Sequence, residues 1–208
     1  MDNDFEQSIN KTRNCISLIF NWFYVWKTLQ NNNYNKIYNK DKYFWTAVIY
    51  SLRDNFLIEL AKIFEKTKKY NILSIHYLLD LIPKGEERED IEKEISNYKP
   101  TIDNLIKWRG NLLAHRNKYF ALNSNELSKR FPIKNDEIEK LINLLEKMLG
   151  KIDSLRTKKG IVYTFSLIKE ESQKDTENII KNLELAYKVK KEQFEEELKK
   201  YHGLYGKK

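Results

Sequence analysis

Apolar residues recur at three- and four-residue steps along most of the chain, which is the spacing of one buried face on an α-helix. This spacing predicts a long helix over residues 4–30 and a second over residues 41–66. The expected core face of the first is Ile9, Ile16, Ile19, Phe20, Phe23 and Trp26, and that of the second is Phe44, Val48, Leu52, Phe56 or Leu57, Leu60 and Phe64. Two helices of this length favour an antiparallel pair at the centre of a small bundle.

Shorter helices are expected over residues 74–82, 86–98 and 100–117, and a loop with one turn at 125–129 over residues 119–132. A further helix is expected over residues 135–155, with Ile138, Leu141, Leu145, Met148 and Ile152 on its inner face. Residues 161–168 are rich in strand-forming types, but a single strand would have no partner, so helix or loop is expected there. The last helix is expected over 175–201, and its charged second half is either a water-facing surface or an interaction tail.

The scarcity of turn residues, six glycines and three prolines in 208 residues, favours an all-α, up-and-down bundle with additional C-terminal helices. We expect a bundle domain over residues 1–157 and a helical extension over 158–208. The single cysteine, Cys15, is expected to be a small buried hydrophobic residue and excludes an internal disulfide. The longest apolar run is too short to cross a bilayer and resembles no signal peptide, so a cytoplasmic protein without a membrane partner is expected.

The formal net charge of +8 indicates a polyanionic partner such as RNA. Residues 98–131 hold a surplus of five positive charges, so the charge is concentrated around one segment, WRGNLLAHRN at residues 108–117. There Arg109, Asn111 and His115 lie within about two helical turns. A permanent cation beside an imidazole that titrates near neutrality suits phosphodiester chemistry without a metal. The alternative is a surface helix that merely contains an arginine and a histidine.

Two stripes follow from helical spacing in this segment. Ile102, Leu105, Leu112 and Leu113 define the buried side, and Thr101, Asn104, Trp108, Asn111 and His115 form a polar stripe, with Arg109 between the two. A polar stripe around a large aromatic residue indicates either the floor of a cleft or a subunit contact. Gly110 within a helix costs about 1 kcal/mol relative to alanine, which indicates that another group packs closely against it.

A long helical pair followed by an R-x5-H helix resembles the HEPN superfamily of small α-helical domains. RGNLLAHRN, together with residues 52–64 (LRDNFLIELAKIF), resembles its abortive-infection U-type branch, and the resemblance covers about residues 15–155. It implies a bundle that forms a homodimer in which two motifs face one shared cleft. Active members of the superfamily are metal-independent endoribonucleases, many of them toxins or anti-phage effectors, in which the ribose 2′-OH attacks the adjacent phosphate.

By position, the resemblance implies that His115 acts as general acid or base and that Arg109 holds the phosphate. Gly110 departs from the family, which usually has Asn, Asp or His directly after the arginine. Asn111, one residue later, remains a third catalytic candidate, although it lies about 100° further around the helix. Five residues are candidates for RNA binding: Trp108 and Tyr119 by base stacking, and Arg116, Asn117 and Lys118 by polar contacts.

Other candidate residues favour structural roles. His76 is expected to be partly buried and hydrogen-bonded, His202 to be exposed, and Asp54 and Glu59 to form salt bridges. Three scattered histidines and one cysteine predict neither a zinc site nor a cofactor. Three functions therefore remain: an endoribonuclease acting in phage defence or as a toxin, a non-catalytic RNA- or nucleotide-binding domain, and a helical dimeric interaction protein whose 108–115 stripe is a subunit seam. An antitoxin or another partner from a defence system is compatible with the first.

Overall fold

The computed structural model describes residues 2–66, 73–113 and 124–205. These residues contain helices and connecting segments and no strand, which confirms the all-α prediction. The helices are α1 (Asp2–Leu29), η1 (Asn32–Tyr34), α2 (Asn35–Tyr38), α3 (Lys42–Phe64), α4 (Ile75–Asp80), α5 (Glu86–Ser96), α6 (Lys99–Trp108), η2 (Arg109–Leu113), α8 (Ser124–Arg130), α9 (Asn135–Thr157) and α10 (Ser166–Tyr205). None of those described has the length and apolar character that crossing a bilayer requires.

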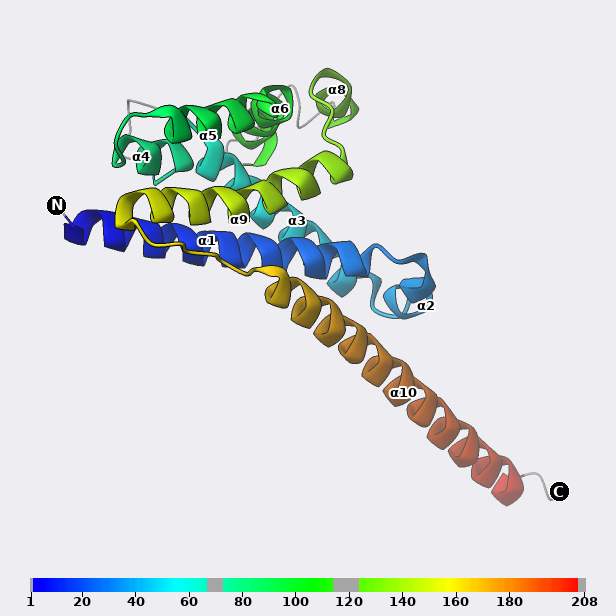
Figure 1. Cartoon of the computed structure of the whole chain (residues 1–208). Helices are drawn as coiled ribbons and strands as arrows, with labels where there is room; N and C mark the ends of the chain where they lie inside the picture. Colours follow the sequence, from blue (N-terminus) through cyan, green and yellow to red (C-terminus); the bar gives the residue numbers. More distant parts are fainter. Residues whose placement is uncertain (1, 67–72, 114–123, 206–208) are drawn as a thin grey trace.

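Helix α1 is the central element of the bundle. Helices α3, α9 and the first half of α10 pack around it, and α3 runs antiparallel to it (Figure 1). Every residue of the predicted α1 core face is buried, so that prediction is confirmed. The helix begins by Asp2, earlier than predicted, so Asp4 lies inside it and is not its N-cap. The Asp4 carboxylate accepts a hydrogen bond from the Tyr77 hydroxyl at 3.2 Å.

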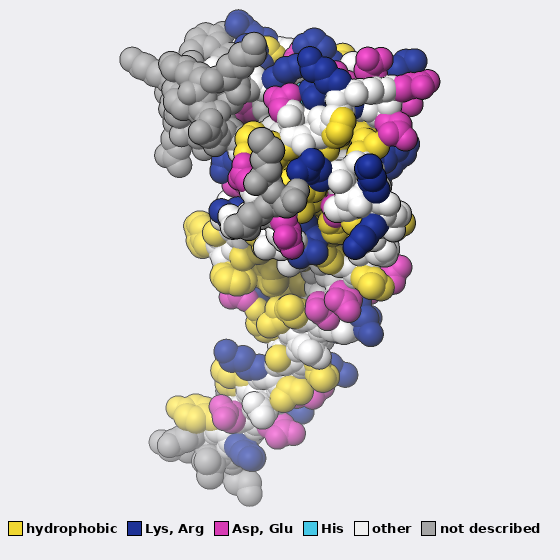
Figure 2. Space-filling view, turned by 60° about the vertical axis from the view of Figure 1, so that its left-hand side comes forward, with side chains coloured by type: hydrophobic (Ala, Val, Ile, Leu, Met, Phe, Trp, Pro, Cys, Tyr) yellow, Lys and Arg dark blue, Asp and Glu magenta, His cyan; other side chains and the backbone are white. Residues whose placement is uncertain are grey.

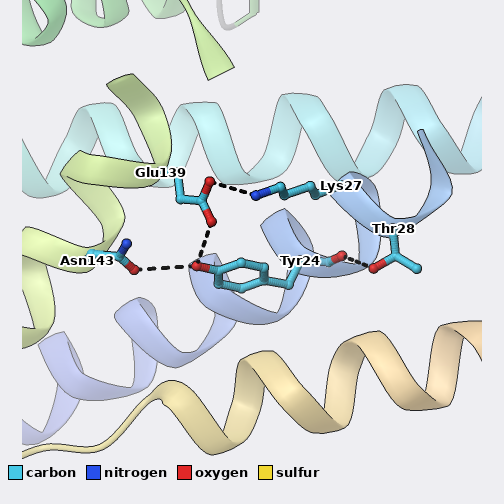
Figure 3. Close-up of polar contacts among 5 residues, drawn as sticks. All are labelled: Tyr24, Lys27, Thr28, Glu139 and Asn143. Atoms are coloured by element: carbon cyan, nitrogen blue, oxygen red, sulfur yellow. Dashed lines mark hydrogen bonds and ion pairs between the residues drawn. The ribbon is translucent and has the colours of Figure 1, made fainter. Parts of the chain in front are cut away.

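Polar contacts join α1 to α9 along the edge of the core (Figure 3). The Tyr24 hydroxyl donates to Glu139 Oε1 at 3.3 Å, and Lys27 Nζ lies 2.6 Å from Glu139 Oε2. The predicted inner face of α9 is fully buried behind these contacts. The two helices are therefore fixed both by apolar packing and by a carboxylate that serves two donors.

The predicted core face of α3 is wrong at its first position. Phe44 is 61% exposed, whereas the neighbouring Trp45 is only 7% exposed. Trp45 packs with Leu29, Ile37 and Ile180 in a second, smaller hydrophobic cluster. The burial shifts by one residue because the N-terminal end of α3 faces α2 and α10, and only its C-terminal half faces the main core.

Helix α10 begins at Ser166, nine residues before the predicted start, so that prediction is wrong. Residues 160–165 are an extended connection that crosses α9 at Gly150, where an added Cβ would lie 3.0 Å from the Ile161 carbonyl oxygen. Phe165 enters the core, which allows a helix to begin directly after it. Residues 161–168 are thus loop and then helix, within the two predicted alternatives.

The two halves of α10 have different surroundings. Ser172, Thr176 and Ile180 are buried on the side that meets α1, whereas every side chain from Lys188 to Tyr201 is exposed. Hydrophobic and charged side chains alternate along the part that extends from the body (Figure 2). Exposure in a single chain fits both a water-facing surface and an interaction tail, so this choice and the domain boundary at 157/158 stay predictions.

Candidate functional site

The motif segment changes its helical form at the arginine. Lys99 and Pro100 begin α6, where the fixed backbone of proline suits the first turn. The α-helix ends at Trp108, and residues 109–113 form one turn of π-helix, a form that occurs frequently at functional sites. The predicted α-helix over 100–117 is therefore correct to residue 108 and wrong over 109–113, and residues 114–117 lie outside the described residues.

Gly110 lies in this π-helical turn. A Cβ added there would meet none of the described atoms within 4 Å. Among the described residues no group packs closely against Gly110, and the expectation of such a contact stays a prediction for the rest.

Arg109 is held by Glu65, the residue that ends α3. The guanidinium Nη2 donates to Glu65 Oε1 at 3.1 Å, and Nη1 donates to Oε2. Each side chain is 19% exposed. Two parallel N–H···O bonds between charged groups fix orientation as well as distance, so this pair positions Arg109 against the C-terminal end of α3.

Three members of the predicted polar stripe bind within their own chain. Thr101 donates to the Glu137 carboxylate at 2.9 Å, Asn104 Nδ2 to the Pro132 carbonyl at 2.9 Å, and Trp108 Nε1 to the Phe131 carbonyl at 2.6 Å. Residues 131 and 132 lie in no helix, so their carbonyl groups need such donors. At these positions the stripe attaches α6 to the segment that leads into α9, and the cleft floor or subunit contact stays a prediction.

The other predicted site residues are placed in part. The Asn111 amide donates to the Lys107 carbonyl at 2.8 Å, on the preceding turn of its own helix. His115, Arg116, Asn117, Lys118 and Tyr119 lie outside the described residues, as do the side chains of Leu112, Leu113 and His202. The structure therefore brings Arg109 together with Glu65, and the predicted pairing of Arg109 with His115 stays a prediction.

Comparison with known proteins matches residues 8–179 to the HEPN_AbiU2 family, described as AbiU2. The chain belongs to this family. The match confirms the resemblance to the abortive-infection U-type branch and extends it from α1 into the first half of α10. No curated protein and no solved structure matches the chain.

Several residues of this AbiU2-family chain have the structural roles expected of them. His76 is half-buried, and burial, followed by the charge of Lys66, lowers its pKa, while a hydrogen bond to the backbone of Phe64 opposes that shift. Arg53 pairs with Asp54 at 2.7 Å and Lys62 with Glu59 at 2.6 Å, which confirms the predicted salt bridges.

Cys15 is half-buried, not buried as expected. Partial burial raises the pKa of its thiol, so the thiol stays protonated at neutral pH. Among the side chains that the structure describes, no group of three or more His, Cys, Asp or Glu residues could hold a metal ion.

The surplus of five positive charges over residues 98–131 of this AbiU2-family chain already counts the two acids of that segment, and each of them pairs with a lysine. Lys99 pairs with Asp103 at 3.3 Å, and Lys129 pairs with Glu126 at 3.2 Å.

Glu65 is the site residue that the sequence pattern does not predict. It is 44 residues from Arg109 in the chain, and only the folding of the bundle brings the C-terminal ends of α3 and α6 together.

Proposed function

We propose that this protein is an endoribonuclease that cleaves RNA without a metal ion, acting in phage defence or as a toxin. The observation that carries the proposal is the position of Arg109. It lies at the start of a π-helical turn, partly exposed and held in one orientation by Glu65, in a chain of the HEPN_AbiU2 family. A cation fixed before substrate arrives stabilises developing charge without reorganising during the reaction.

The proposed reaction begins with attack of a ribose 2′-OH on the adjacent phosphate. The bond to the 5′-oxygen breaks, which leaves a 2′,3′-cyclic phosphate and a 5′-OH. His115, six residues after Arg109, would take the proton from the 2′-OH or give one to the leaving oxygen. Arg109 would bind the phosphate and balance the charge on its equatorial oxygens. General acid–base catalysis of this kind typically contributes about 10²–10⁴-fold.

The test is RNA cleavage by the purified full chain in EDTA, with the termini of the products identified. We expect cyclic phosphate and 5′-OH ends, and we expect His115→Ala to abolish cleavage without lowering the melting temperature. His202→Ala, near the far end of α10, is the matched control and should retain full activity. Cleavage that survives His115→Ala would overturn the proposal.

Gly110 and the closed Arg109–Glu65 pair support a second candidate function, RNA or nucleotide binding without catalysis. A phosphate must share or displace a carboxylate that already occupies two donors of the guanidinium. This function predicts salt-dependent RNA binding without turnover, and Arg109→Ala should weaken the binding. Absence of a gel shift at low salt would exclude it.

The partners belong to the same proposal. We propose a homodimer in the cytoplasm; the HEPN resemblance implies the dimer, with two motifs in a shared cleft, for an active enzyme. Sedimentation equilibrium of the full chain tests the dimer, and a monomer that cleaves RNA would contradict it. An antitoxin or another defence protein would be sought by co-purification from the native host.

A further inference from the structure

A cavity of about 550 Å³ lies between the end of α3 and helices α4, α5 and α6. This volume falls within the range of small-molecule sites, about 300–1,000 Å³. Phe64, Ile95, Ile102 and Ile106 supply its apolar lining. Such a lining, contributed by three helices, suits a flat ring.

The cavity and the candidate site share a wall. Glu65 lines the cavity, and its carboxylate is the group that binds both terminal nitrogens of Arg109. The guanidinium is therefore one side chain away from the cavity. A phosphate bound at Arg109 would have its neighbouring nucleoside within reach of the opening.

The polar part of the lining combines the carboxylates of Glu65, Glu92 and Asp103 with the ammonium groups of Lys66 and Lys99. One carboxylate oxygen of Glu92 lies 3.0 Å from Arg88, and one of Asp103 lies 3.3 Å from Lys99, in each case a cation on the same helix. The second oxygen of each carboxylate is a further hydrogen-bond acceptor. Ionised carboxylates only accept hydrogen bonds. His76 is also in the lining, and its lowered pKa favours the neutral ring, which adds one acceptor nitrogen beside its donor. Because Lys99 is paired with Asp103, the second carboxylate oxygens and the imidazole favour a flat ring that presents hydrogen-bond donors to this part of the lining.

We propose that this cavity binds a nucleobase that carries an exocyclic amino group, on the nucleotide next to the phosphate held by Arg109. Adenine, cytosine and guanine have this group and uracil lacks it. Proteins that recognise single-stranded RNA commonly bind an unstacked base in this way and read its edge. The placement within RNA rests on the proposed ribonuclease function, whereas the binding of the base does not.

The first experiment titrates AMP, GMP, CMP and UMP into the full-length protein and follows binding by calorimetry. At least one of the three amino-bearing nucleotides should bind about tenfold or more tightly than UMP, since a good bidentate contact to a base discriminates by about that factor. Glu92→Gln should remove most of this preference. Glu89→Gln, an exposed change on the same helix, is the control and should keep it. Equal binding of all four nucleotides, or of none, would overturn the proposal.

A second variant fills the cavity. Ile106 is half-buried on α6 in the cavity lining, and Ile106→Trp should abolish nucleotide binding in protein whose far-ultraviolet circular dichroism is unchanged. Binding that persists in a folded Ile106→Trp protein would place the nucleotide elsewhere and overturn the assignment.

Cleavage mapping separates this proposal from the ribonuclease function. In His115→Ala protein, nucleotide binding should remain while cleavage is lost, so each proposal can fail alone. In active protein, the bases flanking the cut sites should change with Glu92→Gln. Nucleotide binding together with unchanged cut sites would assign the cavity to a free nucleotide and overturn its placement in the RNA.

Discussion

Replacing Glu65 with glutamine tests whether the carboxylate that holds Arg109 contributes to stability. Glu65→Gln preserves shape and one acceptor oxygen but removes the negative charge opposite a guanidinium that is only 19% exposed. A hydrogen bond to a charged group contributes about 1.5–3 kcal/mol, and removing one partner of a fully buried ion pair costs about 3–5 kcal/mol. Because one fifth of each side chain still contacts water and glutamine keeps one bond, we expect a loss of about 1.5–3 kcal/mol.

The assay is urea unfolding of the full chain at neutral pH, supported by thermal melting. For a chain of this size, about 1 kcal/mol corresponds to about 2–4 °C, so the melting temperature should fall by about 3–12 °C. The matched control is Glu59→Gln on the same helix, whose partner Lys62 has a side chain 44% exposed. A surface pair of this kind is worth about 0–1 kcal/mol.

A double-mutant cycle with Arg109→Gln isolates the pair itself. The coupling energy between positions 65 and 109 should fall in the range of about 0.5–3 kcal/mol that is typical of residues in contact. A loss in Glu65→Gln no larger than that in Glu59→Gln, or a coupling energy near zero, would refute the conclusion that Glu65 fixes the arginine.

Three further outcomes are expected. Gly110→Ala should raise stability by about 0.5–1 kcal/mol in urea unfolding, because the added methyl group would meet none of the described atoms within 4 Å. Gly150→Ala should lower stability because its Cβ would press on a backbone carbonyl, and equal effects of the two changes would contradict this. Burial lowers the pKa of His76 below its ordinary value of 6.5, so the unfolded chain binds the proton more readily and the free energy of unfolding falls as the pH drops through 6.5 and below. The His76→Gln protein should lose less stability between pH 7.5 and 5.5, and parallel stability curves for the two proteins would refute this. Trp108→Phe leaves the Phe131 carbonyl without its indole donor and should cost about 1–3 kcal/mol by thermal melting, whereas an unchanged melting temperature would count against that bond.

The sequence predicts those parts of the fold that depend on one helix at a time. The core faces of α1 and α9 follow directly from three- and four-residue spacing, because both helices bury one continuous stripe. The same periodicity predicts that Phe44 is buried, but the N-terminal end of α3 faces a different set of neighbours, so Phe44 is exposed. Spacing identifies a stripe, whereas the partner that covers it is a property of the assembled bundle.

The candidate site is predictable to a smaller extent, for a similar reason. The motif itself identifies Arg109, and nothing near it in the chain identifies Glu65. The polar stripe does not predict the bonds of Asn104 and Trp108, because their acceptors, the carbonyl groups of residues 131 and 132, are backbone atoms that side-chain patterns do not reveal. The π-helical turn at residues 109–113 is also wider than an α-helical turn, so the rotation of 100° per residue that defines the stripe does not hold there.

The end of α10 has a consequence for how the protein responds to heat and to solvent exchange. From Lys188 to Tyr201 every side chain is exposed, and the helix is supported by its own backbone bonds and by short-range pairs such as Lys191 with Glu195, each contributing about 0.2–0.5 kcal/mol. An isolated helix of that length is marginal in water, so its amide protons should exchange with deuterium long before those of the first half. Warming should therefore fray this end gradually, giving a sloping baseline before the cooperative transition of the body.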